Sequence, residues 1–369
     1  MTRLDARRRV SEIARSWAWR SHLANDPAGL IAQAERRLAE HTPDVAIEHL
    51  TRANRRRRDV RIEHRLIEAR FEGFAQAQWP QERPAWPESV PDLFPDETIP
   101  EIGRADLTPE RLRSAITHHG SLIVRGFASD AQVSRSVTNI DRALAAYDAT
   151  QTATAGRELA GWFAPFKHDR VSNRKHKREA GAVLAVDSPP AMCALLETFE
   201  EAHVGRLTRD YFGERPALLA RKWSLRTVSH AAHSGDWHQD GAFMGADIRS
   251  LNIWLGLTHC GDTAPGLDIV GRRLDRIVET GTGGAYFSWS VGNSVAEKVA
   301  AGSIVRPIFE PGDALLFDHF LLHRTAIDPG MTHDRHAVEA WFLAPSTYGA
   351  MLGPGHSNDD PRDQIPLLY

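Results

Sequence analysis

The chain has 369 residues, of which 42% are apolar and 25% are charged, and its formal net charge is -3. This composition is typical of a soluble globular protein, and the small net charge argues against a chain built to bind nucleic acid or an anionic membrane. Two widely separated cysteines, Cys193 and Cys260, argue against a disulfide framework or a thiolate zinc site and favour a cytoplasmic location. The sequence contains no run of about 18 apolar residues, so we expect no transmembrane helix. The basic start lacks the apolar stretch of a secretory signal.

Residues 1–78 are predicted to form a helical N-terminal region. Apolar residues recur there at helical spacing, as at Ile62, Leu66 and Ala69. The stretches NDPAG and HTPDV are typical helix starts, because each places a capping residue before a proline in the first turn. We therefore expect three or four helices packed as antiparallel hairpins.

Residues 79–104 are predicted to form a linker. Six prolines in WPQERPAWPESVPDLFPDETIPEIG are incompatible with a regular helix and favour extended, semi-rigid chain. The aromatic residues Trp79, Trp86 and Phe94 indicate that the linker is partly packed down rather than free.

Residues 105–369 are predicted to form a second domain, in which short strands follow a few helices. A helix in LTPERLRSAITHHG, capped by Thr108, precedes a short buried strand in SLIVRGF, and further helices are expected at 129–148 and 189–212. After residue 216 the expected strands lie in ALLARKWSLRTVSHAA, SLNIWLGLTHC, GLDIVGRR, IVRPIFEPGDALLFD and HAVEAWFLAP. Short strands with Gly/Pro punctuation and no regular alternation with helices favour an antiparallel sandwich or barrel.

The stretch SGDWHQDGAFMG, residues 234–245, places His238 and Asp240 two positions apart, so that both side chains point to one face of a strand. Such a pair could bind a metal, act as an acid/base pair, or form an ordinary hydrogen bond. His323 follows about 85 residues later, after another predicted strand. Two imidazoles and one carboxylate form the facial triad that holds Fe(II) and leaves three adjacent positions open. A bidentate oxo-acid fills two of these positions and dioxygen fills the third.

Arg335 is the predicted anchor for the far carboxylate of such an oxo-acid. It opens the strand RHAVEAWF, about a dozen residues after His323, and its guanidinium can form a fork-shaped salt bridge. Thr325 could add a hydroxyl contact to the same carboxylate. Glu339 shares the face of Arg335 in a regular strand, so it could pair with the arginine and compete for it.

Several further residues have two open interpretations. Candidates for either a substrate pocket or the barrel core are Trp237, Phe243, Met244 and Trp254. Candidates for contact with an anionic substrate are Arg221, Lys222 and Arg226, although strand alternation predicts that at least one of them faces solvent. Five more histidines are expected to be structural or solvated, with a zinc site as the minor alternative: His230, His233, His319, His333 and His336. The run Arg55 to Arg58 is expected to be a solvated helix face rather than a nucleic-acid or membrane site.

The segments WHQDGAF, LNIWLGLT, APGLDIV, PGDALLFDHFLLHRT and RHAVEAWF together resemble the phytanoyl-CoA dioxygenase family of Fe(II)/2-oxoglutarate oxygenases, over roughly residues 105–345. This resemblance implies a mainly β fold with flanking helices, in which a double-stranded β-helix (jelly-roll) core accompanies the α-helical N-terminal region. It implies that His238, Asp240 and His323 bind iron, and that Arg335 with Thr325 grips 2-oxoglutarate. Iron halogenases of the superfamily replace the carboxylate with a small residue, so Asp240 implies hydroxylation rather than halogenation.

We therefore expect a cytoplasmic Fe(II)/2-oxoglutarate dioxygenase that oxidises a C–H bond of a small organic molecule. Dioxygen would be consumed, and succinate and carbon dioxide would be released. No nucleic-acid or membrane partner is expected, and the sequence leaves the oligomeric state open. The alternative is a non-catalytic interaction or sensor protein, whose helical N-terminus binds a partner and whose barrel is degenerate. A degenerate barrel has no reason to keep all three ligands and the arginine.

Overall fold

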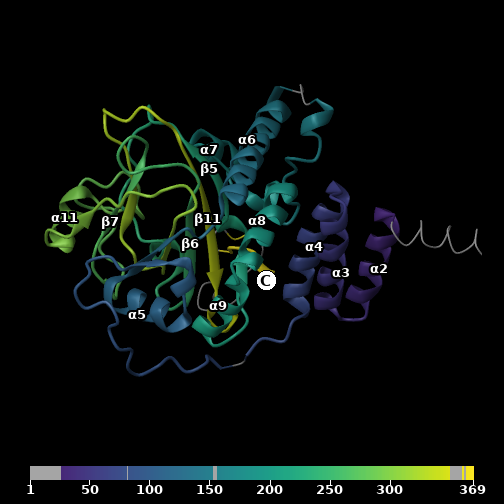
Figure 1. Ribbon diagram of the computed structural model, residues 1–369, viewed down its shortest axis with the longest axis horizontal. Coiled ribbons are helices and arrows are strands. Elements are labelled where there is room, and N and C mark those ends of the chain that lie inside the picture. Colours follow the sequence, from purple (N-terminus) through teal and green to yellow (C-terminus); the bar gives the residue numbers. More distant parts are fainter. Residues whose placement is uncertain (1–25, 81, 153–155, 350–359, 361–362) are drawn as a thin grey trace, which may run out of the picture. The chain divides into compact units, whose positions relative to one another are not determined.

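The computed structural model describes residues 26–80, 82–152, 156–349, 360 and 363–369 (Figure 1). Its contacts divide the chain into two compact units, Met1–Ala77 with Leu368 and Gln78–Leu367 with Tyr369. None of the helices in this described part of the chain has the length and apolar character needed to cross a bilayer.

The described part of the first unit contains three helices, α2 (Pro27–Ala39), α3 (Pro43–Arg56) and α4 (Val60–Gln76). Helices α2 and α3 begin at the two prolines expected from NDPAG and HTPDV, and Asp59 caps α4 by accepting from the Arg61 amide. Apolar side chains on the facing sides, such as Leu50, are fully buried, which holds short helices together. The stretch Arg55 to Arg58 is exposed, and residues 1–25 of the predicted helical region lie outside the described residues.

The proline-rich segment of the second unit forms no helix or strand between Gln78 and Pro100, among the residues described there. It is nevertheless packed against its own unit. The Trp86 ring meets Tyr211 edge-on, with 5.4 Å between centroids, and the guanidinium groups of Arg113 and Arg249 lie 5.2 and 5.0 Å from its centre. Phe94 is buried. The segment therefore behaves as a strap fixed by its aromatic residues.

Two sheets form the centre of the second unit. The larger sheet has nine strands, with the order β1-β2-β9-β6-β11-β4-β12 and with β5 and β3 attached beside β11. The smaller sheet has the order β10-β7-β8. The strands are β1 (Glu101–Gly103), β2 (Ser121–Arg125), β3 (Ala182–Leu184), β4 (Ala217–Leu219), β5 (Ser224–Val228), β6 (Ser250–Gly256), β7 (Gly266–Val270), β8 (Ile304–Val305), β9 (Ala314–Phe317), β10 (His323–Ala326), β11 (Arg335–Leu343) and β12 (Pro366–Leu368).

The two sheets share one hydrophobic core. Trp254 and Trp341 from the larger sheet belong to the same buried cluster as Leu267 and Ile269 from the smaller sheet. All pairings except β1 with β2 are antiparallel among those with a recorded register. The jelly-roll core with flanking helices is thus confirmed. Strand β6 is buried along its whole length, which explains the nearly continuous apolar run in its sequence.

Helices cover the outer face of the larger sheet. Phe199 of α8 packs against Phe342 of β11 and against Trp223, at 6.1 and 5.4 Å between ring centroids, and α6 and α8 lie beside this sheet in Figure 1. Among its described residues, this unit has the helices α5 (Pro109–His119), α6 (Asp130–Thr152), α7 (Arg174–Glu179), α8 (Pro189–Glu201), α9 (Val204–Phe212), α10 (Gly241–Met244) and α11 (Asn293–Ala300). Short 3-10 helices in the same described ranges are η1 (Arg104–Asp106), η2 (Arg157–Leu159), η3 (Ala185–Asp187), η4 (Ala220–Lys222) and η5 (Pro345–Thr347).

Candidate metal centre

A short backbone bridge brings the two predicted histidine ligands side by side. His238 lies in the connection between β5 and β6, and it pairs with His323, the first residue of β10. The His238 amide donates to the His323 carbonyl at 2.9 Å, and the reverse bond is 3.1 Å. The strand expected around residues 234–245 is reduced to isolated bridges at Trp237 and His238, but the two imidazole rings still lie 4.4 Å apart.

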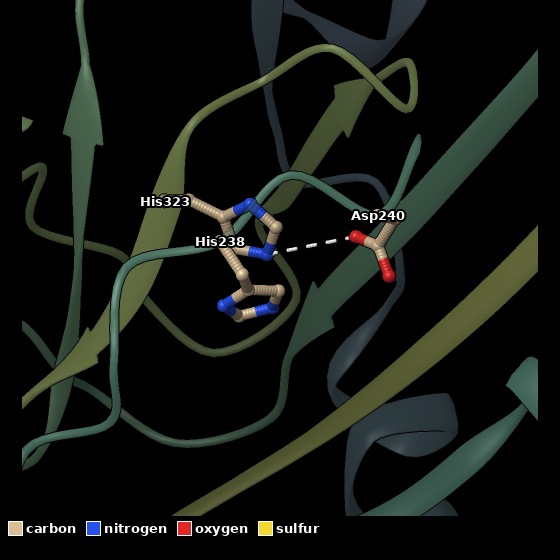
Figure 2. A group of neighbouring side chains, drawn as sticks. All are labelled: His238, Asp240 and His323. Carbon is tan, nitrogen blue, oxygen red and sulfur yellow. Dashed lines mark ion pairs between the residues drawn. The ribbon is translucent and has the colours of Figure 1, made fainter. Parts of the chain in front are cut away.

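Asp240, the residue directly before α10, completes the cluster. One ligand atom each from His238, Asp240 and His323 lies within 4.8 Å of the other two, and no other such group of three or more occurs within the described ranges. Figure 2 shows the three side chains converging, with His323 Nε2 3.9 Å from Asp240 Oδ2.

The protonation of both rings suits metal binding. The Nδ1 atoms of His238 and His323 each lie 3.0 Å from a backbone carbonyl, that of Asp236 and of Leu321 respectively. A carbonyl can only accept, so each Nδ1 carries a hydrogen, which leaves Nε2 as the ring nitrogen that can bind a metal. Histidine ligands in metalloproteins are commonly fixed in this way.

Burial and charge set the ionisation of the cluster. Burial lowers the pKa of His323 to about 4, and the neighbouring His238 adds to this shift. Burial alone would raise the pKa of Asp240, but Lys222 and the two histidines outweigh it and lower this pKa to about 2. At neutral pH the site therefore presents a carboxylate and a neutral His323 imidazole, which are the forms that bind a divalent metal.

Gly241 is required by the turn that aims Asp240. A β-carbon at this position would lie 2.4 Å from Ile277 Cδ1 and 2.9 Å from His319 Cδ2. Because His319 is buried and cannot easily move away, a side chain at this position would push Asp240 away from the histidines. Close packing around the turn therefore explains why a glycine follows the predicted His-x-Asp pair.

Arg335 is fully buried at the start of β11. Its Nη1 donates to the Gly266 carbonyl at 2.7 Å and to the Pro265 carbonyl at 3.2 Å, and its guanidinium lies 5.4 Å from the centre of the Trp254 ring. Its Nε and Nη2 have no hydrogen-bond partner among the described residues. Burial lowers the pKa of Arg335 to about 10, so the group remains charged at neutral pH. A buried cation with two free donors matches the fork of a carboxylate.

The neighbours of Arg335 do not compete for it. Glu339 pairs with Arg226 at 3.1 Å, so the competition considered for Glu339 and Arg335 is absent. Thr325 is a buried residue of β10 that lines a cavity of about 910 Å³ together with Arg226 and His238.

The remaining substrate candidates occupy two kinds of position. Met244 and Trp254 are buried in the core between the sheets, and Trp237 belongs to a smaller buried cluster. Phe243 is only partly buried and meets Trp289 edge-on at 5.7 Å. Trp289 also meets His238 edge-on at 5.9 Å, and it lines the cavity.

Sequence reasoning missed two features around the proposed metal centre. One is the pair Phe287 and Trp289, whose rings stack at 4.8 Å and stay partly exposed at the cavity wall. The segment YFSW was a signal, because three aromatic residues stand together in a Gly-rich loop. The other is the hydrogen bond from Lys222, considered above only as a contact for an anionic substrate, whose Nζ lies 2.7 Å from Asp240 Oδ1.

The other basic and histidine candidates have structural contacts. Contrary to the alternation argument, none of Arg221, Lys222 and Arg226 is an exposed residue, and Arg221 pairs with Asp169 at 2.9 Å. Four of the five extra histidines bond to side chains outside the triad, namely His230 to Asp334, His319 to Ser250, His333 to Thr332 and His336 to Asp141. His233 lines the cavity.

A jelly-roll core that holds two histidines, one aspartate and a buried arginine is the arrangement expected of an Fe(II)/2-oxoglutarate oxygenase. The profile of the phytanoyl-CoA dioxygenase (PhyH) family matches residues 116–327, more than half of the chain, and the chain belongs to this family. It is accordingly an Fe(II)/2-oxoglutarate-dependent dioxygenase, with Fe(II) as cofactor and 2-oxoglutarate as co-substrate.

Several solved structures are distantly similar to the chain. EvdO2 from Micromonospora carbonacea var. aurantiaca, complexed with 2-oxoglutarate, is 18% identical, with a TM-score of 0.43 over 68% of this chain and 94% of that chain. EctD from S. alaskensis, with 2-oxoglutarate and 5-hydroxyectoine, is 17% identical, with a TM-score of 0.47 over 73% and 87%. The carbocyclase SnoK from nogalamycin biosynthesis is 12% identical, with a TM-score of 0.47 over 73% and 99%. Similarity this low transfers no substrate or reaction, and no curated protein matches the chain.

Proposed function

We propose that the chain hydroxylates a C–H bond of a small organic molecule, with His238, Asp240 and His323 as the Fe(II) ligands and Arg335 as the 2-oxoglutarate anchor. The observation that carries this proposal is the buried Arg335 guanidinium, which lies in the same barrel as the three ligands. Its Nε and Nη2 have no hydrogen-bond partner among the described residues. A buried cation with unsatisfied donors is costly to keep. A carboxylate that binds there offsets this cost.

The donor set fits Fe(II). Two imidazole nitrogens and one carboxylate oxygen are available, and both cysteines are buried outside the cluster and form no disulfide. Bound Fe(II) supplies the activation of dioxygen, coupled to the decarboxylation of 2-oxoglutarate to succinate and carbon dioxide. The protein contributes orientation: the backbone bridge fixes the two rings, and Gly241 allows the turn that brings Asp240 to them.

The cavity beside His238 is the proposed substrate site. Its volume of about 910 Å³ lies within the range of small-molecule pockets, roughly 300–1,000 Å³. Trp289 and Phe287 offer aromatic surface on one side, and Arg226 and Thr325 offer polar groups. Asp240 occupies the position that a halide would need, which favours hydroxylation over halogenation. The cytoplasmic location and the absence of nucleic-acid and membrane partners stay predictions.

The test is succinate formation from 2-oxoglutarate with Fe(II) and dioxygen, in the wild type and in Asp240→Ala. We expect the wild type to form succinate and Asp240→Ala to form none, although its circular dichroism stays that of the folded chain. A screen of small molecules with isotopically labelled dioxygen then identifies the substrate by its gain of one labelled oxygen atom. Unchanged succinate formation in Asp240→Ala would show that the assignment of the iron ligands is wrong.

A further inference from the structure

Lys222 is enclosed beside the proposed metal centre rather than placed on the surface. It is the last residue of η4, and its side chain is 17% exposed. Its Nζ lies 2.7 Å from Asp240 Oδ1, 4.0 Å from the centre of the Phe243 ring and 5.9 Å from the centre of the Trp341 ring. One carboxylate and two aromatic faces therefore fix the position of the ammonium group.

The two oxygens of Asp240 have different neighbours. Oδ1 accepts the hydrogen bond from Lys222, whereas Oδ2 lies 3.9 Å from His323 Nε2. A carboxylate can bind a metal through one oxygen or through both. With Oδ1 engaged by the ammonium group, Oδ2 is the oxygen that is better placed for a metal held with the histidines.

We propose that Lys222 is a positioning residue that restricts Asp240 to one-oxygen ligation and so keeps open the metal position that 2-oxoglutarate needs. This inference rests on the proposed function. A facial triad is useful only while three adjacent positions stay open for the co-substrate and dioxygen. Ligation of Asp240 through its second oxygen would occupy one of these positions.

Metal retention does not explain the contact. A cation beside a divalent metal repels it, so a lysine hydrogen-bonded to a ligand lowers the electrostatic part of metal affinity. Nor does the contact belong to a general ion-pair network, because Arg221 pairs with Asp169 and Arg226 pairs with Glu339. Lys222 alone among these three cations bonds to a proposed ligand. A role in the geometry of that ligand accounts for its placement.

The test compares Lys222→Met with Lys222→Arg in the full chain, with Co(II) as a redox-inert probe. Methionine keeps a stem against Phe243 and Trp341 but removes the donor, whereas arginine keeps a cationic donor. Loss of a hydrogen bond to a metal ligand typically costs about 10–100-fold in affinity or activity. We expect Lys222→Met to bind Co(II) within about tenfold of the wild type, because relief of the repulsion offsets the lost bond. Its affinity for 2-oxoglutarate should fall by at least about tenfold.

Two further readouts separate positioning from a merely structural role. The visible absorption of Co(II) should change in Lys222→Met, since a second carboxylate oxygen in an otherwise open position changes the ligand set. Lys222→Arg should keep the wild-type spectrum and 2-oxoglutarate affinity. If Lys222→Met does not fold by circular dichroism, Lys222→Gln is measured against the same thresholds.

The outcomes distinguish this inference from the proposed function. Wild-type 2-oxoglutarate affinity and an unchanged Co(II) spectrum in Lys222→Met would overturn the inference and leave the proposed function intact. Equal losses in the Met and Arg variants would also overturn it, as would a loss of Co(II) affinity beyond about 100-fold. If the Co(II)-loaded wild type itself does not bind 2-oxoglutarate, the proposed function fails and the inference fails with it.

Discussion

Replacement of Arg335 by methionine should strongly weaken 2-oxoglutarate binding while the fold persists. Truncation of one partner of a buried, hydrogen-bonded charge pair costs about 2–5 kcal/mol, which corresponds to a loss in affinity of about 30-fold to several thousand-fold. Without the co-substrate, two effects oppose each other. The variant loses the bonds from Nη1 to the Gly266 and Pro265 carbonyls, but it also loses a buried charge whose Nε and Nη2 are unsatisfied. Each effect is of order 1–3 kcal/mol, so the free energy of unfolding should change little.

The assay is urea denaturation of the Co(II)-loaded protein with and without 2-oxoglutarate. At a concentration 100 times its Kd, 2-oxoglutarate should raise the free energy of unfolding of the wild type by about 2.7 kcal/mol. The same concentration should stabilise Arg335→Met by less than about 0.9 kcal/mol, because a loss in affinity of about 30-fold or more leaves it at no more than about three times the new Kd. Co(II) binding should persist in both proteins. Equal stabilisation of the two proteins would refute the anchoring role of Arg335, and Arg226 in the cavity wall would be the next residue to test.

Three further outcomes follow from packing and charge. Gly241→Ala, which forces a β-carbon against Ile277, should lower the free energy of unfolding by about 1–3 kcal/mol and weaken Co(II) binding, whereas Gly330→Ala, with open space around it, should do neither. Because burial lowers the pKa of His323 from 6.5 to about 4, the unfolded chain binds a proton that the folded chain does not. The free energy of unfolding of the metal-free protein should therefore fall as pH drops from 6.5 to 4, and a pH series of urea titrations should show a smaller fall in His323→Gln. Phe199→Ala, at a fully buried position, should cost about 3–5 kcal/mol of stability but leave Co(II) affinity per folded molecule unchanged, as calorimetry can measure.

The sequence predicts the barrel and the cluster because both rest on local patterns. Buried strands between Gly/Pro turns indicate an antiparallel β structure, and residue types and spacing mark His238, Asp240 and His323 as candidate ligands. Arg335 stands out because it begins a strand and is therefore held rigidly. The structure brings the first three together and buries the fourth.

Contacts between distant segments escape such patterns. Strand alternation fails for Arg221 and Lys222 because η4 interrupts the chain between β4 and β5, so neither side chain follows the two-residue period. The helix expected at 189–212 divides into α8 and α9 at His203, whose φ of 57° is left-handed. Nothing in the adjacent residues reveals that Glu339 pairs with Arg226, since that pairing depends on the register between β11 and β5.

The proposed iron and 2-oxoglutarate sites are tested most directly by an anaerobic titration of the wild-type chain with Fe(II) and 2-oxoglutarate, followed by the charge-transfer absorption of a chelated 2-oxo acid. We expect saturation at one Fe(II) and one 2-oxoglutarate per chain in the wild type. The absorption should be absent in Asp240→Ala and should need far more 2-oxoglutarate in Arg335→Met. A full-strength band in Asp240→Ala, or no band in a folded, iron-loaded wild type, would contradict the assignment of this site.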